Sequence, residues 1–399
     1  MLMRVKRTGN AWQFSYSYDS LHWTPAFAFN QAMQVARVGP YAANGQYGAA
    51  PAPAFTAVVD HFINRTSPPA TVDGSPYPPS PVAPAVNVWY GDTQTFGQNG
   101  IPQQWVNILG DVTGFDQVTN LTYTLNGGSP QTLWMGENMF RLVAPGEFNV
   151  EIDYASLSAG TNTVQITATD TFGRQATHTV TVSYVAGQTW PSNYTVNWST
   201  ASSIQSVAQI VDGQWQLQSN GTVRNQEIGY DRLIAIGDRT TWKNYTVTAE
   251  VTLNAGDPFG YAVGIVVGWQ GHTTVQYGQV LPDQPRTGHP FPGLFEYSMG
   301  SGGAPNLNIY ENTATTPENV MVKDTSGRTL QLGTKYIFKG QVAANTTGGS
   351  HYSFKVWPAS SSEPATWDLQ TDGELSQGSI ILAAHMADVS FGTVTITGQ

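Results

Sequence analysis

The chain has 399 residues, enough for two or three domains with separate cores. Charged residues make up only 11% of the sequence, and 17 Lys and Arg against 27 Asp and Glu give a net charge of -10, which excludes a basic nucleic-acid surface. The longest apolar stretches, such as Tyr261–Trp269, are far short of the roughly 20 residues of a membrane-spanning helix, and the absence of cysteine excludes disulfides and thiolate metal sites.

The composition predicts an all-β protein. Gly (41) and Pro (24) are abundant, as are Trp (12), Tyr (18) and Phe (16), and within residues 187–399 no segment repeats its apolar residues at a helical period over more than two turns. Low charge and many aromatic residues are typical of secreted or cell-surface β proteins. Because residues 1–7 lack the apolar core of a signal peptide, we expect either a removed leader or a start inside a longer protein with further domains.

Residues 1–65 are predicted to form strands at Leu2–Lys6, Ala11–Tyr18, Gln34–Tyr41 and Phe55–Phe62, with a turn at residues 19–23. The stretches Arg7–Thr24, Val38–Asn44 and Ala54–Phe62 resemble the final third of concanavalin-like jelly rolls of bacterial secreted proteins. Since such a domain has about 200 residues, the resemblance implies a truncated, partial jelly-roll segment. His22 and His61 belong to this region and are interpreted as surface or hydrogen-bonded residues.

Residues 66–85 contain seven prolines and one charged residue, Asp73, and are predicted to be a stiff linker. The next module, residues 86–186, has strand signals at Asn87–Tyr90, Gln104–Asp111, Val118–Leu125, Gln131–Met135, Phe148–Asp153, Gly160–Asp170 and Gln175–Tyr184. Alternation places Val164, Ile166 and Ala168 on one face. The last two strands resemble the end of immunoglobulin-like and cadherin-like repeats, which implies a spacer domain.

Residues 187–399 form the largest predicted module. Its strand signals are Gly213–Ser219, Arg232–Gly237, Tyr245–Leu253, Tyr261–Trp269, Gly293–Met299, Asn306–Glu311, Lys335–Val342, His351–Trp357, Ser379–Ala384 and Val389–Thr397. The segments Asp231–Asp238, Tyr245–Thr252, Lys335–Val342 and Ala387–Ile396 resemble laminin-G-like, concanavalin-like jelly rolls. That resemblance implies a two-sheet sandwich.

The segment between Gly271 and Gly293 is the candidate site, because a loop of more than 15 residues in a compact β module is usually functional or disordered. It is rich in residues that stack on sugar rings or bind their hydroxyl groups. The predicted ligand-binding residues are Trp269, Gln270, His272, Arg286, His289, Phe291, Glu296 and Tyr297. Arg286 would prefer an acidic sugar, unless it pairs with Glu296 or Asp283 and the histidines cap loop carbonyl groups.

The order of Gln270, His272 and then Tyr336–Gly340 is similar to the motifs of jelly-roll alginate lyases. That resemblance implies that the Gln and the His handle the uronate. The family tyrosine is missing, because Gln341 and Val342 follow Gly340. The candidate catalytic residues, if the protein is an enzyme, are therefore Gln270, His272 as base, Arg286 and Tyr297.

Four acidic residues are candidate metal ligands. Asp257 near a turn and Asp388 before the last strand are candidate calcium ligands, with turn capping as the alternative. Glu151 and Asp153 share one strand face, which is interpreted as an exposed face or a calcium site between repeats, because the third acid of jelly-roll glucanases is missing.

The sequence therefore favours a secreted, modular protein whose C-terminal jelly roll binds a polysaccharide or other glycan without catalysis, with calcium as its one candidate cofactor. Two alternatives stay open: a polysaccharide lyase or glycoside hydrolase that uses the same groove, and a structural adhesin or envelope protein.

Overall fold

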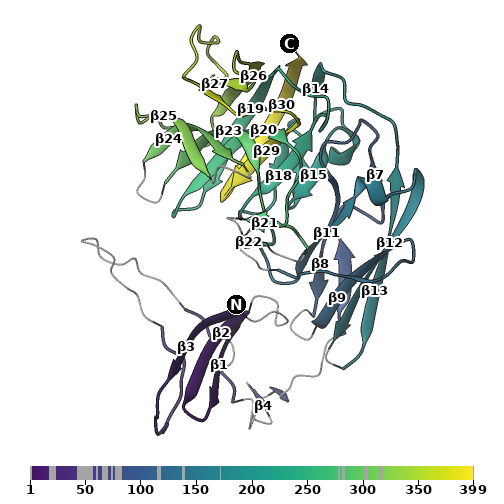
Figure 1. Cartoon of the computed structure of the whole chain (residues 1–399), viewed down its shortest axis with the longest axis vertical. Coiled ribbons are helices and arrows are strands. Elements are labelled where there is room, and N and C mark those ends of the chain that lie inside the picture. Colours follow the sequence, from purple (N-terminus) through teal and green to yellow (C-terminus); the bar gives the residue numbers. More distant parts are fainter. Residues whose placement is uncertain are drawn as a thin grey trace. The chain divides into compact units, whose positions relative to one another are not determined.

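The computed structural model describes residues 2–17, 24–42, 57–59, 62–64, 71–72, 75–76, 83–114, 118–136, 140–170, 172–276, 279–280, 284–300, 304–313 and 318–398. Over these residues the regular structure is almost entirely β, which confirms the predicted all-β class. The chain divides into two compact units, Met1–Ala83 and Pro84–Gln399 (Figure 1). No helix in the described ranges has the length and hydropathy to cross a membrane.

The unit at the N-terminus contains an antiparallel three-stranded sheet of β1 (Leu2–Thr8), β2 (Ala11–Ser17) and β3 (Thr24–Asn30). A short pair, β4 (Thr71–Val72) and β5 (Ser75–Pro76), lies inside the proline-rich segment. The strand predicted at Gln34–Tyr41 is wrong, since these residues are exposed and form no ladder. The predicted turn at residues 19–23, with His22, lies outside the described residues, as do His61 and half of Phe55–Phe62, while the described residues 57–59 and 62 form no strand.

The first sandwich, residues 84–186, packs two sheets face to face. One sheet has the order β10 (Gln131–Thr132), β9 (Val118–Leu125), β12 (Gly160–Asp170), β13 (Gln175–Tyr184), β7 (Thr93–Phe96). The other has the order β11 (Glu147–Asp153), β8 (Trp105–Thr113), β6 (Ala85–Val88), and the 3₁₀ turn η2 (Tyr154–Ser156) follows β11. The predicted alternation along β12 is confirmed, because Val164, Ile166 and Ala168 are each fully buried.

The second sandwich, residues 187–399, also has two sheets (Figure 1). The larger one has the order β16 (Trp215–Leu217), β17 (Val223–Asn225), β30 (Ala387–Gly398), β19 (Tyr245–Gly256), β26 (Lys335–Ala344), β27 (Ser350–Pro358), β28 (Leu369–Gly373), with β14 (Tyr194–Val196) beside β30. The seven-stranded sheet has the order β15 (Gln209–Asp212), β18 (Arg232–Ile236), β29 (Ser379–His385), β20 (Tyr261–Trp269), β23 (Phe291–Met299), β24 (Pro305–Asn312), β25 (Asn319–Asp324). The 3₁₀ turn η3 (Ile204–Ser206) precedes β15, and β21 (Val275–Gln276) pairs with β22 (Gln279–Val280).

The main core lies between the two sheets of the second sandwich. Alternate residues of β20 and β23, such as Ile265, Phe295 and Tyr297, meet Phe338 and Phe354 of the facing sheet. The rings of Phe295 and Phe354 stack with centroids 5.3 Å apart. Because strand side chains alternate, the intervening residues of the seven-stranded sheet point to its other side, which we call the outer face.

One half of the outer face is covered by the first sandwich. A second apolar cluster, which includes Val266, Trp269 and Ile381, is buried there. The covering surface is polar: the indole N–H of Trp269 donates to Gln103 Oε1 at 2.9 Å, and Asn149 Nδ2 donates to the Val211 carbonyl at 2.9 Å. The first sandwich, predicted as a spacer between the two jelly-roll segments, is therefore docked onto the second sandwich.

A buried ion cluster of Arg141, Glu151, Asp212, His272 and Arg286 fastens the two sandwiches together. Arg141 binds Glu151 at 2.5 Å and Asp212 at 2.8 Å, and all three side chains are almost fully excluded from solvent. Burial lowers the pKa of Arg141, but the charges of Asp212 and Glu151 outweigh it, so the net shift is upward. The guanidinium group thus stays charged between the two carboxylates.

We predict that Glu151→Gln destabilises the chain by about 3 to 5 kcal/mol, because it leaves the buried guanidinium group of Arg141 and the partly buried one of Arg286 with one carboxylate fewer. The matched control is Asp153→Asn on the same strand, where the carboxylate accepts from the Ala155 N–H at the start of η2. That control should cost about 1 kcal/mol or less. Urea unfolding followed by tryptophan fluorescence measures both variants. Equal effects of the two changes would show that the ion cluster does not stabilise the chain.

Candidate functional site

The predicted site around His272 is closed to ligands. His272 is only 2% exposed. Its Nε2 lies 3.0 Å from Asp212 Oδ2, and its Nδ1 lies 3.1 Å from the Gly288 carbonyl oxygen. Burial and the charge of Arg141 lower the pKa of His272, although the hydrogen bond to Asp212 opposes that shift. With both ring nitrogens occupied, His272 has no nitrogen that could act as a base on a bound sugar.

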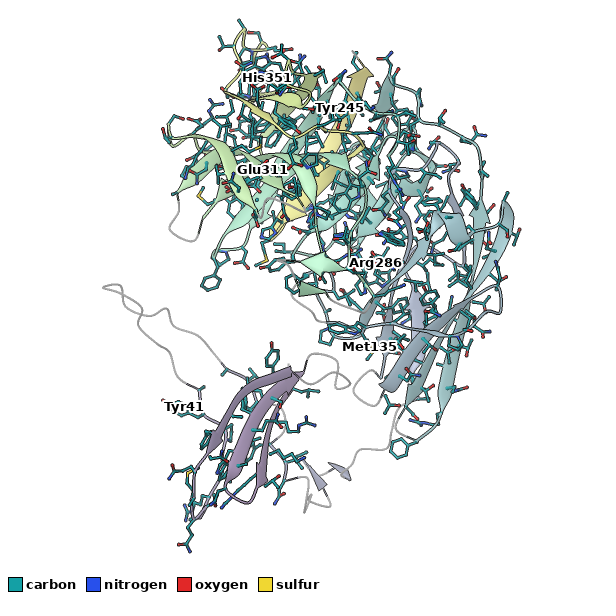
Figure 2. All side chains as sticks on the ribbon, in the orientation of Figure 1. Tyr41, Met135, Tyr245, Arg286, Glu311 and His351 are labelled. Carbon is teal, nitrogen blue, oxygen red and sulfur yellow. The ribbon has the colours of Figure 1, made fainter. Side chains whose placement is uncertain are left out.

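Arg286 is also occupied, and its partner differs from both of those expected. Its Nη1 lies 2.9 Å from Glu151 Oε2, and its guanidinium carbon lies 3.6 Å from the centre of the Trp105 ring. Arg286 lies where the two sandwiches meet (Figure 2). The interpretation of Glu151 as an exposed or calcium-binding residue is therefore wrong, because this carboxylate is buried between two arginines.

Trp269 and Gln270 lie at the end of β20, beside the contact between the two sandwiches. The amide group of Gln270 donates to the carbonyl groups of Arg239 and Gln377 and accepts from the Arg239 guanidinium group. Trp269 is fully buried, with its ring edge-to-face against His272 and His289 at 5.0 and 4.9 Å. Trp269 therefore presents no surface to a sugar, and the exposed Gln270 has its amide oxygen and nitrogen occupied by Arg239 and Gln377.

Tyr297 does not join this group. It is fully buried in the core between the sheets, and its hydroxyl oxygen accepts from the Leu330 N–H at 3.2 Å. Its neighbour Glu296 points to the outer face, since successive residues of β23 alternate. The expectation that His272, Arg286 and Tyr297 line one pocket is therefore wrong.

The two candidate metal ligands have other partners. Asp257 accepts from the Phe259 N–H at 2.8 Å, which is turn capping. Asp388 lines a hollow of about 180 Å³ and holds Arg224 through both carboxylate oxygens. Within the described ranges no three His, Asp or Glu side chains are grouped as a metal site. These contacts give no support for a calcium ion at Asp257 or Asp388.

The half of the outer face left open by the first sandwich carries a different group of polar residues. Asp231 binds two histidines: its Oδ1 lies 2.8 Å from His385 Nδ1, and its Oδ2 lies 3.1 Å from His289 Nδ1. Burial raises the pKa of Asp231, but hydrogen bonds to both histidines outweigh it and hold the pKa well below the ordinary value. The side chain of His385 is 38% exposed. Its Nδ1 is thus fixed, and the ring is open to solvent.

Glu296 lies on the same face as His385. Gly264 of β20 pairs with Glu296, and Ala262 pairs with His385, so no large side chain separates the two groups across β20. Burial raises the pKa of Glu296 to about 7, against an ordinary value of 4.5, although His385 and Ser298 act in the opposite direction. We call Glu296, His385 and Asp231, with their neighbours on this face, the open-face site.

The open-face site has polar and aromatic neighbours. Asn308, which pairs with Glu296, donates to Ser298 Oγ at 3.0 Å, and its own amide oxygen is buried without a partner. Tyr230 packs edge-to-face against His385 at 4.9 Å, and Phe140 of the first sandwich packs against Tyr230 at 6.0 Å. The docked sandwich thus supplies an aromatic border, 37% exposed at Phe140, for the polar centre.

Sequence reasoning found Glu296 and His289 but missed His385, Asp231 and Tyr230. The missed signal was alternation: His385 ends an apolar strand at a position that faces the same side as Glu296. The contact between His385 and Asp231 spans 154 residues, which no local motif reveals.

Comparisons with known proteins find fold likenesses only. No family model matches the sequence, and no curated protein matches it. The carbohydrate-binding module CBM66 from Bacillus subtilis is 12% identical, with a TM-score of 0.32 over 48% of this chain and 95% of that one. The Emp46p carbohydrate recognition domain is 12% identical, with a TM-score of 0.37 over 52% and 97%. Alginate lyase Aly36B is 12% identical, with a TM-score of 0.32 over 52% and 97%. Likeness this weak says nothing of what this chain binds.

We predict that Glu296→Gln changes stability in a pH-dependent manner. Below pH 4.5 the carboxyl group is protonated in both the folded and unfolded chain, so variant and wild type should be alike. As pH rises through about 7, the folded wild type must ionise a partly buried group and loses stability that the variant keeps. The variant should therefore be more stable by about 1 to 3 kcal/mol at pH 8. Urea unfolding at pH 4 and pH 8 measures this, and a difference independent of pH would contradict it.

Proposed function

We propose that the chain binds a glycan at the open-face site. The observation that supports this proposal is the pairing of the aromatic border, Tyr230 and Phe140, with the hydrogen-bonding groups of Glu296 and His385. Aromatic rings stack on the apolar faces of sugars, and amide, carboxyl and imidazole groups bind the hydroxyl groups. Sites of this kind often lie where two domains meet.

An uncharged sugar suits this site better than an acidic one. The negative charges of Asp231, Glu296 and Glu318 all raise the pKa of His385. The nearby cation is Lys323, an exposed residue that pairs with Asn308 on the neighbouring strand. Arg286, the residue on which an acidic ligand was expected to depend, is neutralised by Glu151. Carboxylates at the centre of the site would repel a uronate.

A glycan also suits the site better than a protein partner. The centre of the open-face site is polar, whereas the apolar cluster of the outer face is already buried. Protein interfaces need a larger apolar centre. Binding of an extracellular polysaccharide would place the chain outside the cell or at its surface, and that location is part of this proposal.

We predict that Tyr230→Ala weakens glycan binding by about 10-fold, or about 1.4 kcal/mol, through loss of stacking area. Binding is measured on an array of neutral and acidic glycans and then by calorimetry. The matched control is Phe259→Ala, because Phe259 is 71% exposed at a turn outside the site. Equal loss in both variants, or an array without any signal, would contradict the proposal and favour a structural role.

A further inference from the structure

The Asp231 carboxylate fixes the orientation of His385. Both of its oxygens bind histidine Nδ1 atoms, at 2.8 Å for His385 and 3.1 Å for His289. His289 is in turn held by its edge-to-face contacts with Trp269 and Phe291. An imidazole whose Nδ1 is bound by a carboxylate presents its Nε2 for proton transfer.

A second pair in this chain shows that such a contact alone is not a site. His351 Nδ1 lies 2.8 Å from Asp372 Oδ1 on the other sheet, and its side chain is also 38% exposed (Figure 2). However, Gln370 Nε2 lies 3.3 Å from the Nε2 of His351. What distinguishes His385 is its surroundings: a half-buried Glu296 across β20, a buried Asn308 and the ring of Tyr230.

We propose that the open-face site hydrolyses the glycan it binds, with His385 as general acid and Glu296 as general base. This inference rests on the proposed function. The backbones of β29 and β23 lie two strand spacings, about 10 Å, apart with β20 between them. A glycosidic bond bound over β20 would lie between the two groups, with the attacking water on the side of Glu296, as an inverting hydrolysis requires.

The step balances in atoms and protons. Glu296 takes a proton from water while the water oxygen forms a bond to the anomeric carbon. The bond from that carbon to the glycosidic oxygen breaks, and His385 Nε2 gives its proton to the leaving oxygen. A proton then passes from Glu296 to His385 through solvent, which restores the starting state. No oxidant, metal or cofactor takes part in this step.

The electrostatics of the site agree with these roles. Burial lowers the pKa of His385, but Asp231, Glu296 and Glu318 outweigh it and raise the net value, which favours the protonated form that a general acid needs. Burial places the pKa of Glu296 at about 7, within the range of a general base. Tyr310, which also faces Glu296, has its pKa raised by burial to about 12 and stays neutral. Turnover should therefore fall as pH drops below about 7.

The test uses the full chain with soluble glucan, mannan, xylan and galactan, followed by release of reducing ends. His385→Ala should lower polysaccharide turnover by about 100-fold or more. The same variant should keep most of its activity on the nitrophenyl glycoside of the same sugar, whose leaving group needs no acid. Glu296→Gln should lose both activities, and azide should restore turnover with an azido-sugar product.

Matched controls separate catalysis from structure. His351→Ala and Glu311→Gln remove a histidine and a glutamate outside the proposed pair and should leave turnover unchanged. Binding of the polysaccharide without release of reducing ends by the wild type would overturn this inference and leave the proposed function intact. Absence of binding would overturn both, and loss of turnover on nitrophenyl glycosides in His385→Ala would overturn the acid role.

Discussion

The buried ion cluster is the interaction on which the rest of the arrangement depends. Arg141 neutralises carboxylates from both sandwiches, Glu151 from the first and Asp212 from the second. Charges this deep tolerate little displacement, because any separation leaves one of them buried without a counter-ion. The cluster therefore fixes how the first sandwich lies on the seven-stranded sheet.

That docking decides which part of the outer face can bind a ligand. The half that carries Trp269 and Val266 is sealed, and the half that carries Glu296 and His385 is left with an aromatic border from Phe140. The contact between the sandwiches thus gives His272 and Arg286 a structural role. It also places Phe140 at the border of the neighbouring open-face site. Polar residues in the two halves look alike in sequence and differ only in what covers them.

Alternation along the strands predicted the sandwiches, and in β12 it predicted the buried face correctly. The same rule, applied to β23, separates Glu296 from Tyr297 and shows that both could not serve one site. The docking of the two sandwiches could not be predicted from the sequence, because Arg141 and Asp212 are 71 residues apart and belong to different modules. An exposed strand carboxylate and a buried one, such as Glu151, have the same local sequence signal. His385 was missed for the same reason, since its partners come from distant strands.

Hydrogen exchange with and without a bound neutral glycan tests the central claim, that the ligand lies on the open half of the seven-stranded sheet. The account predicts slower exchange in β23, β24 and at the end of β29, with β27 and β28 of the other sheet unchanged. Protection confined to β27 and β28, or to the hollow beside Arg224 and Asp388, would contradict it.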